Sequence, residues 1–124
     1  MPGTILLIDD DVALVSLIKR KLMLAGFDVE VAPDGVLAMQ AAQRVKPQLV
    51  ILDMQFPGGG GQEVMERLKR SVSTQHVPVV ILTAADDVGL EKRMIDLGAV
   101  AYIQKPVDLD SLVEEAHRLT RWKR

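Results

Sequence analysis

Residues 5–10 read ILLIDD, a short apolar run that ends in two carboxylates, Asp9 and Asp10. The pattern recurs in residues 49–53, LVILD, and in residues 79–83, VVILT, which end in Asp53 and Thr83. Unbroken apolar runs of this length are typical of strands that are covered on both faces of a parallel sheet. Because the carboxyl ends of parallel strands lie along one edge, we expect these polar residues to meet there.

Segments with helical spacing alternate with the strand-like runs along the chain. We expect strands over Thr4–Ile8, Phe27–Ala32, Leu49–Leu52, Pro78–Leu82 and Val100–Ile103. We expect helices over Asp11–Ala25, from Gly35 to just before Pro47, and over Glu63–Arg70, Asp86–Leu97 and Asp108–Arg121. Five strand–helix units with short connections predict one α/β domain, a doubly wound five-stranded parallel sheet with helices on both faces.

Local residue choices refine this picture. Phe27–Ala32 alternates apolar and acidic residues, which predicts an edge strand. The glycines of Pro57–Gly61 predict a loop, and Gly89 is expected to break the fourth helix. Asp11 and Asp108 are placed to begin helices, where a carboxylate compensates the helix dipole.

The composition excludes several classes of function. The chain has 124 residues, of which 48% are hydrophobic and 26% charged, as is usual for a single globular domain. A net charge of −2 gives no support for direct binding of nucleic acid, and the absence of cysteine excludes thiol chemistry. No uncharged apolar stretch approaches the ~20 residues that cross a membrane. The first four residues do not resemble a signal peptide, so we expect a cytoplasmic protein.

The polar residues at the predicted sheet edge have the chemistry of a cation and phosphoryl site. Three carboxylates, from Asp9, Asp10 and Asp53, repel one another unless a cation neutralises them, and Mg²⁺ prefers such oxygen ligands. Thr83 can donate a hydrogen bond to a phosphoryl oxygen, and Lys105, which follows a fourth apolar run, can neutralise it. Taken singly, Thr83 also fits an ordinary strand residue and Lys105 a solvated lysine before a turn.

Four motifs appear in order along the chain: IDD at residues 8–10, LD at 52–53, LTA at 82–84 and YIQKP at 102–106. With Gly98-Ala99 before the fifth strand, they make the whole chain resemble the receiver domain of two-component response regulators. The resemblance implies a flavodoxin-like fold with strand order 2-1-3-4-5. It also implies that the Lys105–Pro106 peptide bond is cis.

The resemblance further implies a role for each residue of the site. Asp53 is expected to accept a phosphoryl group in a step that depends on Mg²⁺ or Mn²⁺. The expected metal ligands are Asp9 (through water), Asp10, Asp53 and the backbone carbonyl of Gln55. Thr83 and Lys105 are expected to bind the phosphoryl group, and the ring of Tyr102 to change rotamer with the state of the site.

The implied partner is a histidine kinase or phosphotransfer protein that carries a phosphohistidine. Such a chain signals to an effector domain or target protein through its fourth helix, fifth strand and fifth helix, and catalyses only its own phosphorylation and dephosphorylation. Val100-Ala101 replaces acids that many DNA-binding regulators use to dimerise, and Gln55 and Ala85 occupy positions that tune hydrolysis. His76 and His117 are expected on the surface, away from the strand ends.

Residues 121–124, RWKR, fit either the solvated basic end of the last helix or the start of a linker. A free-standing receiver and a receiver within a longer protein therefore both remain open.

Two other classes of protein fit the sequence less well. A phosphatase of the haloacid dehalogenase type needs a second Asp two residues after its nucleophile, where this chain has Gln55. A flavodoxin needs a phosphate-binding loop after the first strand, where Asp9, Asp10 and Asp11 would repel phosphate.

Overall fold

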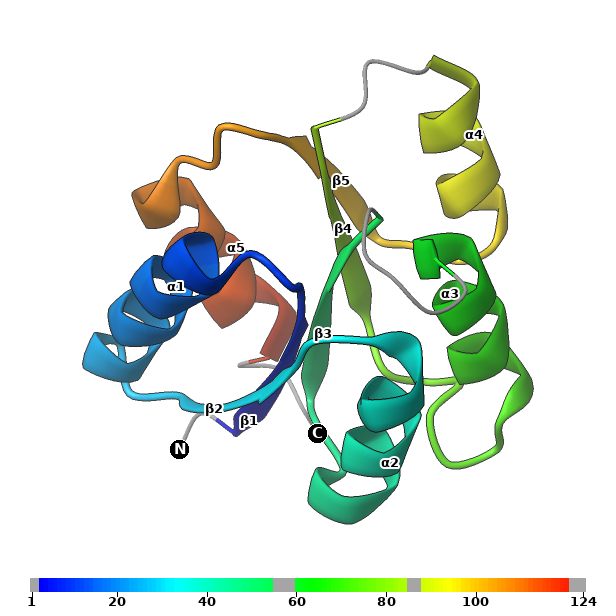
Figure 1. The fold of residues 1–124 in the computed structure, drawn as a ribbon, viewed down its shortest axis with the longest axis horizontal. Coiled ribbons are helices and arrows are strands. Elements are labelled where there is room, and N and C mark those ends of the chain that lie inside the picture. Colours follow the sequence, from blue (N-terminus) through cyan, green and yellow to red (C-terminus); the bar gives the residue numbers. More distant parts are fainter. Residues whose placement is uncertain (1–2, 55–59, 85–87, 121–124) are drawn as a thin grey trace.

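The computed structural model of the protein describes residues 3–54, 60–84 and 88–120. Five strands alternate with five helices along the chain (Figure 1). The strands are β1 (Thr4–Ile8), β2 (Asp28–Ala32), β3 (Leu49–Asp53), β4 (Val79–Thr83) and β5 (Ala101–Gln104). The helices are α1 (Val12–Leu24), α2 (Gly35–Val45), α3 (Gly60–Arg70), α4 (Val88–Asp96) and α5 (Leu109–Thr120).

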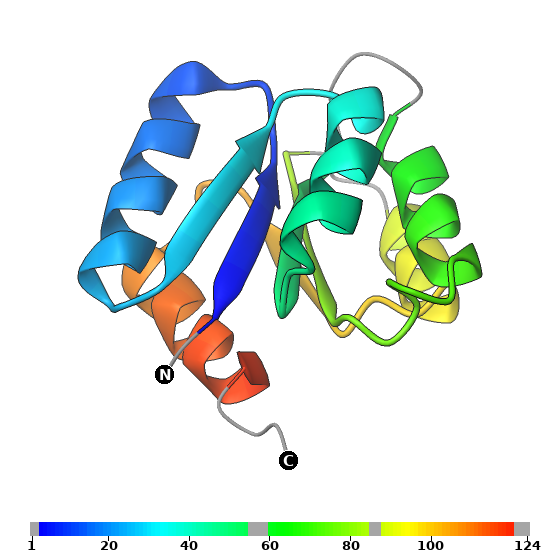
Figure 2. The same cartoon turned by 90° about the horizontal axis from the view of Figure 1, so that it is seen from below.

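The strands form one parallel sheet in the order β2-β1-β3-β4-β5, which confirms the expected topology and places β2 at an edge. Helices α1 and α5 cover one face of the sheet, and α2, α3 and α4 cover the other (Figures 1 and 2). Every residue of β3 and β4 is buried, which explains why their sequences are continuously apolar up to the last position.

The sheet separates two apolar cores. Alternate residues of β1 show the division: Leu6 and Ile8 pack with α2, α3 and α4, whereas Ile5 and Leu7 pack with α1 and α5. Because successive side chains of a strand point to opposite faces, a shift of one residue in the register of β1 would exchange the two sets. The buried central strands therefore fix the register, and with it the position of the residues that follow each strand.

The ends of helices α1 and α5 have the capping residues that the sequence indicates. Asp11 accepts a hydrogen bond from the Leu14 N–H at the start of α1, and Asp108 accepts from the Ser111 N–H at the start of α5. Gly26, directly after the C-cap of α1, has φ +102°, a left-handed conformation that suits glycine. The Lys105–Pro106 peptide bond is cis, as expected.

Some expectations were wrong. Gly60 and Gly61 belong to the first turn of α3, so the expectation of a loop over Pro57–Gly61 was wrong for these two glycines; residues 57–59 lie outside the described part of the chain. Gly89 does not break α4, which is continuous from Val88 to Asp96; a glycine keeps its backbone N–H and C=O, and its entropic cost of about 1 kcal/mol relative to alanine does not end the helix.

The expected positions of two side chains also need correction. The helical spacing of Leu37, Ala38, Ala41, Ala42 and Val45 predicts that all five face the core. Leu37 is nevertheless 45% exposed, because the stripe that reaches the core consists of the small residues Ala38, Ala41 and Ala42. His76 is exposed as expected, whereas His117 is half-buried, with its ring centroid 5.0 Å from that of Phe27. Among the described helices, none is both long and apolar enough to cross a membrane.

Candidate functional site

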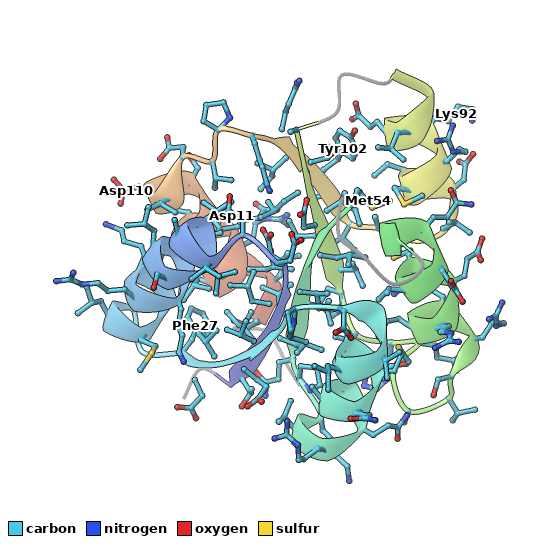
Figure 3. All side chains as sticks on the ribbon, viewed as in Figure 1. Asp11, Phe27, Met54, Lys92, Tyr102 and Asp110 are labelled. Carbon is cyan, nitrogen blue, oxygen red and sulfur yellow. The ribbon has the colours of Figure 1, made fainter. Side chains whose placement is uncertain are left out.

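Four neighbouring strands bring the polar residues of the sequence motifs together at the carboxyl edge of the sheet. Asp9 and Asp10 follow β1, Asp53 ends β3, Thr83 ends β4 and Lys105 follows β5. One carboxylate oxygen from each of Asp9, Asp10 and Asp53 lies within 4.8 Å of the others. In Figure 3, Asp11 marks the α1 side of this edge, with Met54 and Tyr102 on the side of α3 and α4.

Burial and backbone hydrogen bonds hold the three acids in different environments. Asp9 and Asp53 are only 1% and 2% exposed, whereas Asp10 is exposed to solvent. The Asp9 N–H donates to the Ala32 carbonyl of β2 at 3.1 Å, and the Asp9 carboxylate accepts from the Asp11 N–H at 3.0 Å. Asp9 is therefore fixed from both sides, while Asp10 presents its carboxylate toward water.

Lys105 bridges the two buried acids. Its Nζ lies 3.5 Å from Asp9 Oδ2 and 3.4 Å from Asp53 Oδ1, and its side chain is largely buried. The Lys105 N–H donates to the Thr83 carbonyl at 2.8 Å, so the lysine backbone is tied to the end of β4. Three carboxylates and one ammonium leave a formal charge of −2 at this edge. A divalent cation has the charge and the preference for oxygen that such a site requires.

Thr83 and Tyr102 connect this edge to the α4 side of the sheet. Thr83 is fully buried at the end of β4, directly before the chain leads to α4. Tyr102 lies on β5, in register with Ile81 of β4, and is half-buried against the core that contains Leu90 and Met94 of α4. A change at Thr83 can therefore reach Tyr102 through neighbouring elements. Gln55, expected to supply a metal-binding carbonyl, lies outside the described residues.

A groove beside the acids was not anticipated from the sequence. Its lining combines Asp9 and Asp10 with side chains of α1 and of the end of β2, including Val12, Lys19 and Pro33. A sequence signal for this groove is the apolar residue Val12 directly after three acids. In the structure it lies in the first turn of α1 and is 81% exposed. Of the acids that line the groove, Asp10 is the exposed one.

A comparison with protein families identifies the domain. The family model for the response regulator receiver domain matches residues 5–117, which is most of the chain. The chain belongs to the response regulator receiver family. Its fold and its acidic cluster are those expected of a receiver domain, in which such a cluster fits a magnesium and phosphorylation site.

Named relatives and solved structures support this assignment. The DNA-binding dual master transcriptional regulator RpaA of Synechocystis sp. is 36% identical over 117 residues, which are 94% of this chain and 48% of that protein. A response regulator from Chloroflexus aurantiacus superposes with a TM-score of 0.89 at 28% identity, covering 96% of this chain and 98% of that one. The BeF3-activated receiver domain of Klebsiella pneumoniae RstA gives 0.88 at 29% identity, covering 96% and 99%. The chain thus spans about half of the length of the curated relative and nearly the whole length of the two solved chains.

Proposed function

We propose that this receiver accepts a phosphoryl group on Asp53 from the phosphohistidine of a histidine kinase or phosphotransfer protein, in a step that depends on Mg²⁺ or Mn²⁺. The observation that carries the proposal is the gathering of Asp9, Asp10, Asp53 and Lys105 at one sheet edge with a formal charge of −2. Phosphoryl transfer needs mainly positioning and neutralisation of charge, and both are available at this edge.

Each side chain of the site is proposed to have a separate role in the transfer. A carboxylate oxygen of Asp53 attacks the phosphorus, the new O–P bond forms as the P–N bond to the histidine breaks, and the leaving imidazole takes up a proton. Lys105 neutralises charge on the phosphoryl oxygens, and the Thr83 hydroxyl donates a hydrogen bond to one of them. Asp9, Asp10, Asp53 and the Gln55 carbonyl would hold the divalent cation, which neutralises the same oxygens when bound.

The output is proposed to pass through the face formed by α4, β5 and α5 to an effector domain or target protein. The burial of Tyr102 against α4 supports this direction. The name of the Synechocystis relative describes a DNA-binding regulator about twice as long as this chain, which supports an effector outside the receiver domain. We propose that this domain itself catalyses only its own phosphorylation and dephosphorylation, and that it works in the cytoplasm.

Phosphorylation with a small donor tests the assignment. Incubation with acetyl phosphate and Mg²⁺ is expected to add one phosphoryl group to the wild-type chain, seen as an increase in intact mass, and none to Asp53→Asn. Asp34→Asn is the matched control, because Asp34 caps α2 through the Leu37 N–H and is not part of the acidic cluster. Labelling of Asp53→Asn at wild-type stoichiometry would place the acceptor elsewhere.

A further inference from the structure

The first turn of α3 packs against the backbone that follows the acceptor. The Gly61 N–H lies 3.3 Å from the Met54 carbonyl oxygen. A β-carbon at residue 61 would lie 2.7 Å from the Met54 Cα, 2.7 Å from the Met54 Sδ and 3.0 Å from the Asp53 carbonyl oxygen. Real β-carbons do not approach a backbone carbon so closely, so any other residue at this position forces one of the two segments to move.

The neighbouring Gly60 serves a different purpose. Its φ is +77°, and a β-carbon there would meet nothing within 4 Å. Gly60 is therefore required for backbone conformation, whereas Gly61, in an ordinary helical turn, is required for space. The two adjacent glycines have separable roles, although the sequence alone presents them as one run.

Packing decides which segment would yield if residue 61 had a side chain. Helix α3 is anchored in the core by Val64, Met65 and Leu68, each at most 2% exposed. On the other side, the Met54 N–H donates to the Leu82 carbonyl of β4 at 3.0 Å, the last backbone hydrogen bond between this segment and β4 before the described chain stops. Met54 is half-buried and lies directly after the last residue of β3, so its backbone is easier to displace than a helix with three buried anchors.

We infer that Gly61 is a positioning residue for phosphorylation. Because it lets α3 contact the Met54 backbone, it holds the end of β3 in place, and with it the Asp53 carboxylate next to the Lys105 ammonium group. This inference rests on the proposed function of Asp53. The substitution Gly61→Ala is expected to move the Asp53–Met54 backbone and so misplace the nucleophile. Misplacement by about 1 Å can reduce a rate by on the order of a hundredfold.

The test compares Gly61→Ala with Gly98→Ala. Gly98 has φ +111°, so alanine strains the backbone there, but the nearest atom to a β-carbon is Cε of the Lys69 side chain at 3.4 Å, and the position lies beyond α4, away from the acidic site. Labelling by acetyl phosphate at saturating Mg²⁺ is expected to slow at least tenfold in Gly61→Ala and to change less than twofold in Gly98→Ala. The free energy of unfolding of both variants, measured in urea, shows whether their losses of stability are comparable.

Amide exchange at Met54 gives a second readout that does not depend on phosphorylation. Gly61→Ala is expected to lose protection at the Met54 amide, because its bond to Leu82 is strained, whereas Gly98→Ala retains it. Equal labelling rates in the two variants, with Met54 protected in both, would overturn the inference. If the wild-type chain takes no phosphoryl group, the proposed function fails, and Met54 protection alone then decides whether Gly61 positions the strand end.

Discussion

At the scale of single residues, the acidic site is a balance between three carboxylates and one ammonium. Lys105 lies between Asp9 and Asp53, and both of those acids are almost completely buried. Asp10 is the exposed member of the cluster and has no ion pair among the described residues. Its negative charge therefore opposes the neighbouring acids until a cation binds, and this gives Asp10 opposite effects on stability and on metal affinity.

Substitution of Asp10 by Ala is expected to separate these two effects. The affinity for Mg²⁺ should fall by at least roughly tenfold, since a ligand is lost. The melting temperature without metal should rise by about 1–3 °C, because repulsion within the cluster is relieved. Calorimetric titration with Mg²⁺ and thermal unfolding measure the two quantities. Asp11→Ala is the control, because it removes an adjacent acid that caps α1 and is expected to retain metal binding. An Asp10→Ala variant with wild-type affinity would contradict the assigned ligand.

At the scale of elements, α3 is tied to the turn before β4 by a lysine outside the acidic site. Lys69 Nζ donates to the carbonyls of Gln75 and Val77, at 3.2 and 2.9 Å. Its aliphatic stem lies over Gly98, where the chain leaves α4. No carboxylate pairs with Lys69 among the described residues, and burial lowers the pKa of its ammonium group. The Lys69 ammonium group is thus hydrogen-bonded to neutral carbonyls, and burial removes part of its favourable hydration.

This lowered pKa predicts a particular dependence of stability on pH. Between the pKa of Lys69 in the folded protein and the ordinary lysine pKa of about 10.4, the unfolded chain binds more protons, so folding becomes more favourable as the pH rises. The free energy of unfolding of the wild type, relative to Lys69→Met, should therefore increase through that window. Urea unfolding at a series of alkaline pH values measures the difference. Lys92→Met is the control, because Lys92 is an exposed lysine paired with Asp96.

At the scale of the whole molecule, the acidic edge and the proposed output face are joined through β4 and α4. Helix α4 is short, and only Leu90 and Met94 among its described side chains are buried. Thin packing places an element at the low-stability end of a fold, where switching segments are found. By contrast, the acids of the site follow or end the buried strands β1 and β3.

Amide hydrogen exchange with and without beryllofluoride and Mg²⁺ is expected to reveal this asymmetry. Protection should change most in residues 83–84, 88–97 and 100–102, because a phosphoryl analogue draws the Thr83 hydroxyl toward it and shifts the connection to α4. Helix α1 should change little. The Asp53→Asn variant serves as the control and should show no response. An even change across all helices would mean that binding stabilises the fold without a switch in α4.

The features that could be predicted from the sequence are those that depend on residues close together along the chain. The apolar runs that end in Asp9, Asp53 and Thr83 predicted the strands, because burial on both faces of a parallel sheet requires continuous apolar residues. The receiver motifs then indicated the topology and the residues of the edge. These signals are local, and the structure confirms the strands within one or two residues.

The order of the elements, the covering of both faces of the sheet by helices and the polar residues at the strand ends could all be predicted from the sequence. Three other features depend on the folded chain: Lys105 bridges Asp9 and Asp53, Leu37 faces solvent, and Gly61 touches Met54. Periodicity records which face of an element is buried. It does not record the path of the backbone or the distance between side chains 96 positions apart, as Lys105 and Asp9 are. Those distances follow from the registers of four strands and from the close approach of α3 to β3, which exist only in the folded chain.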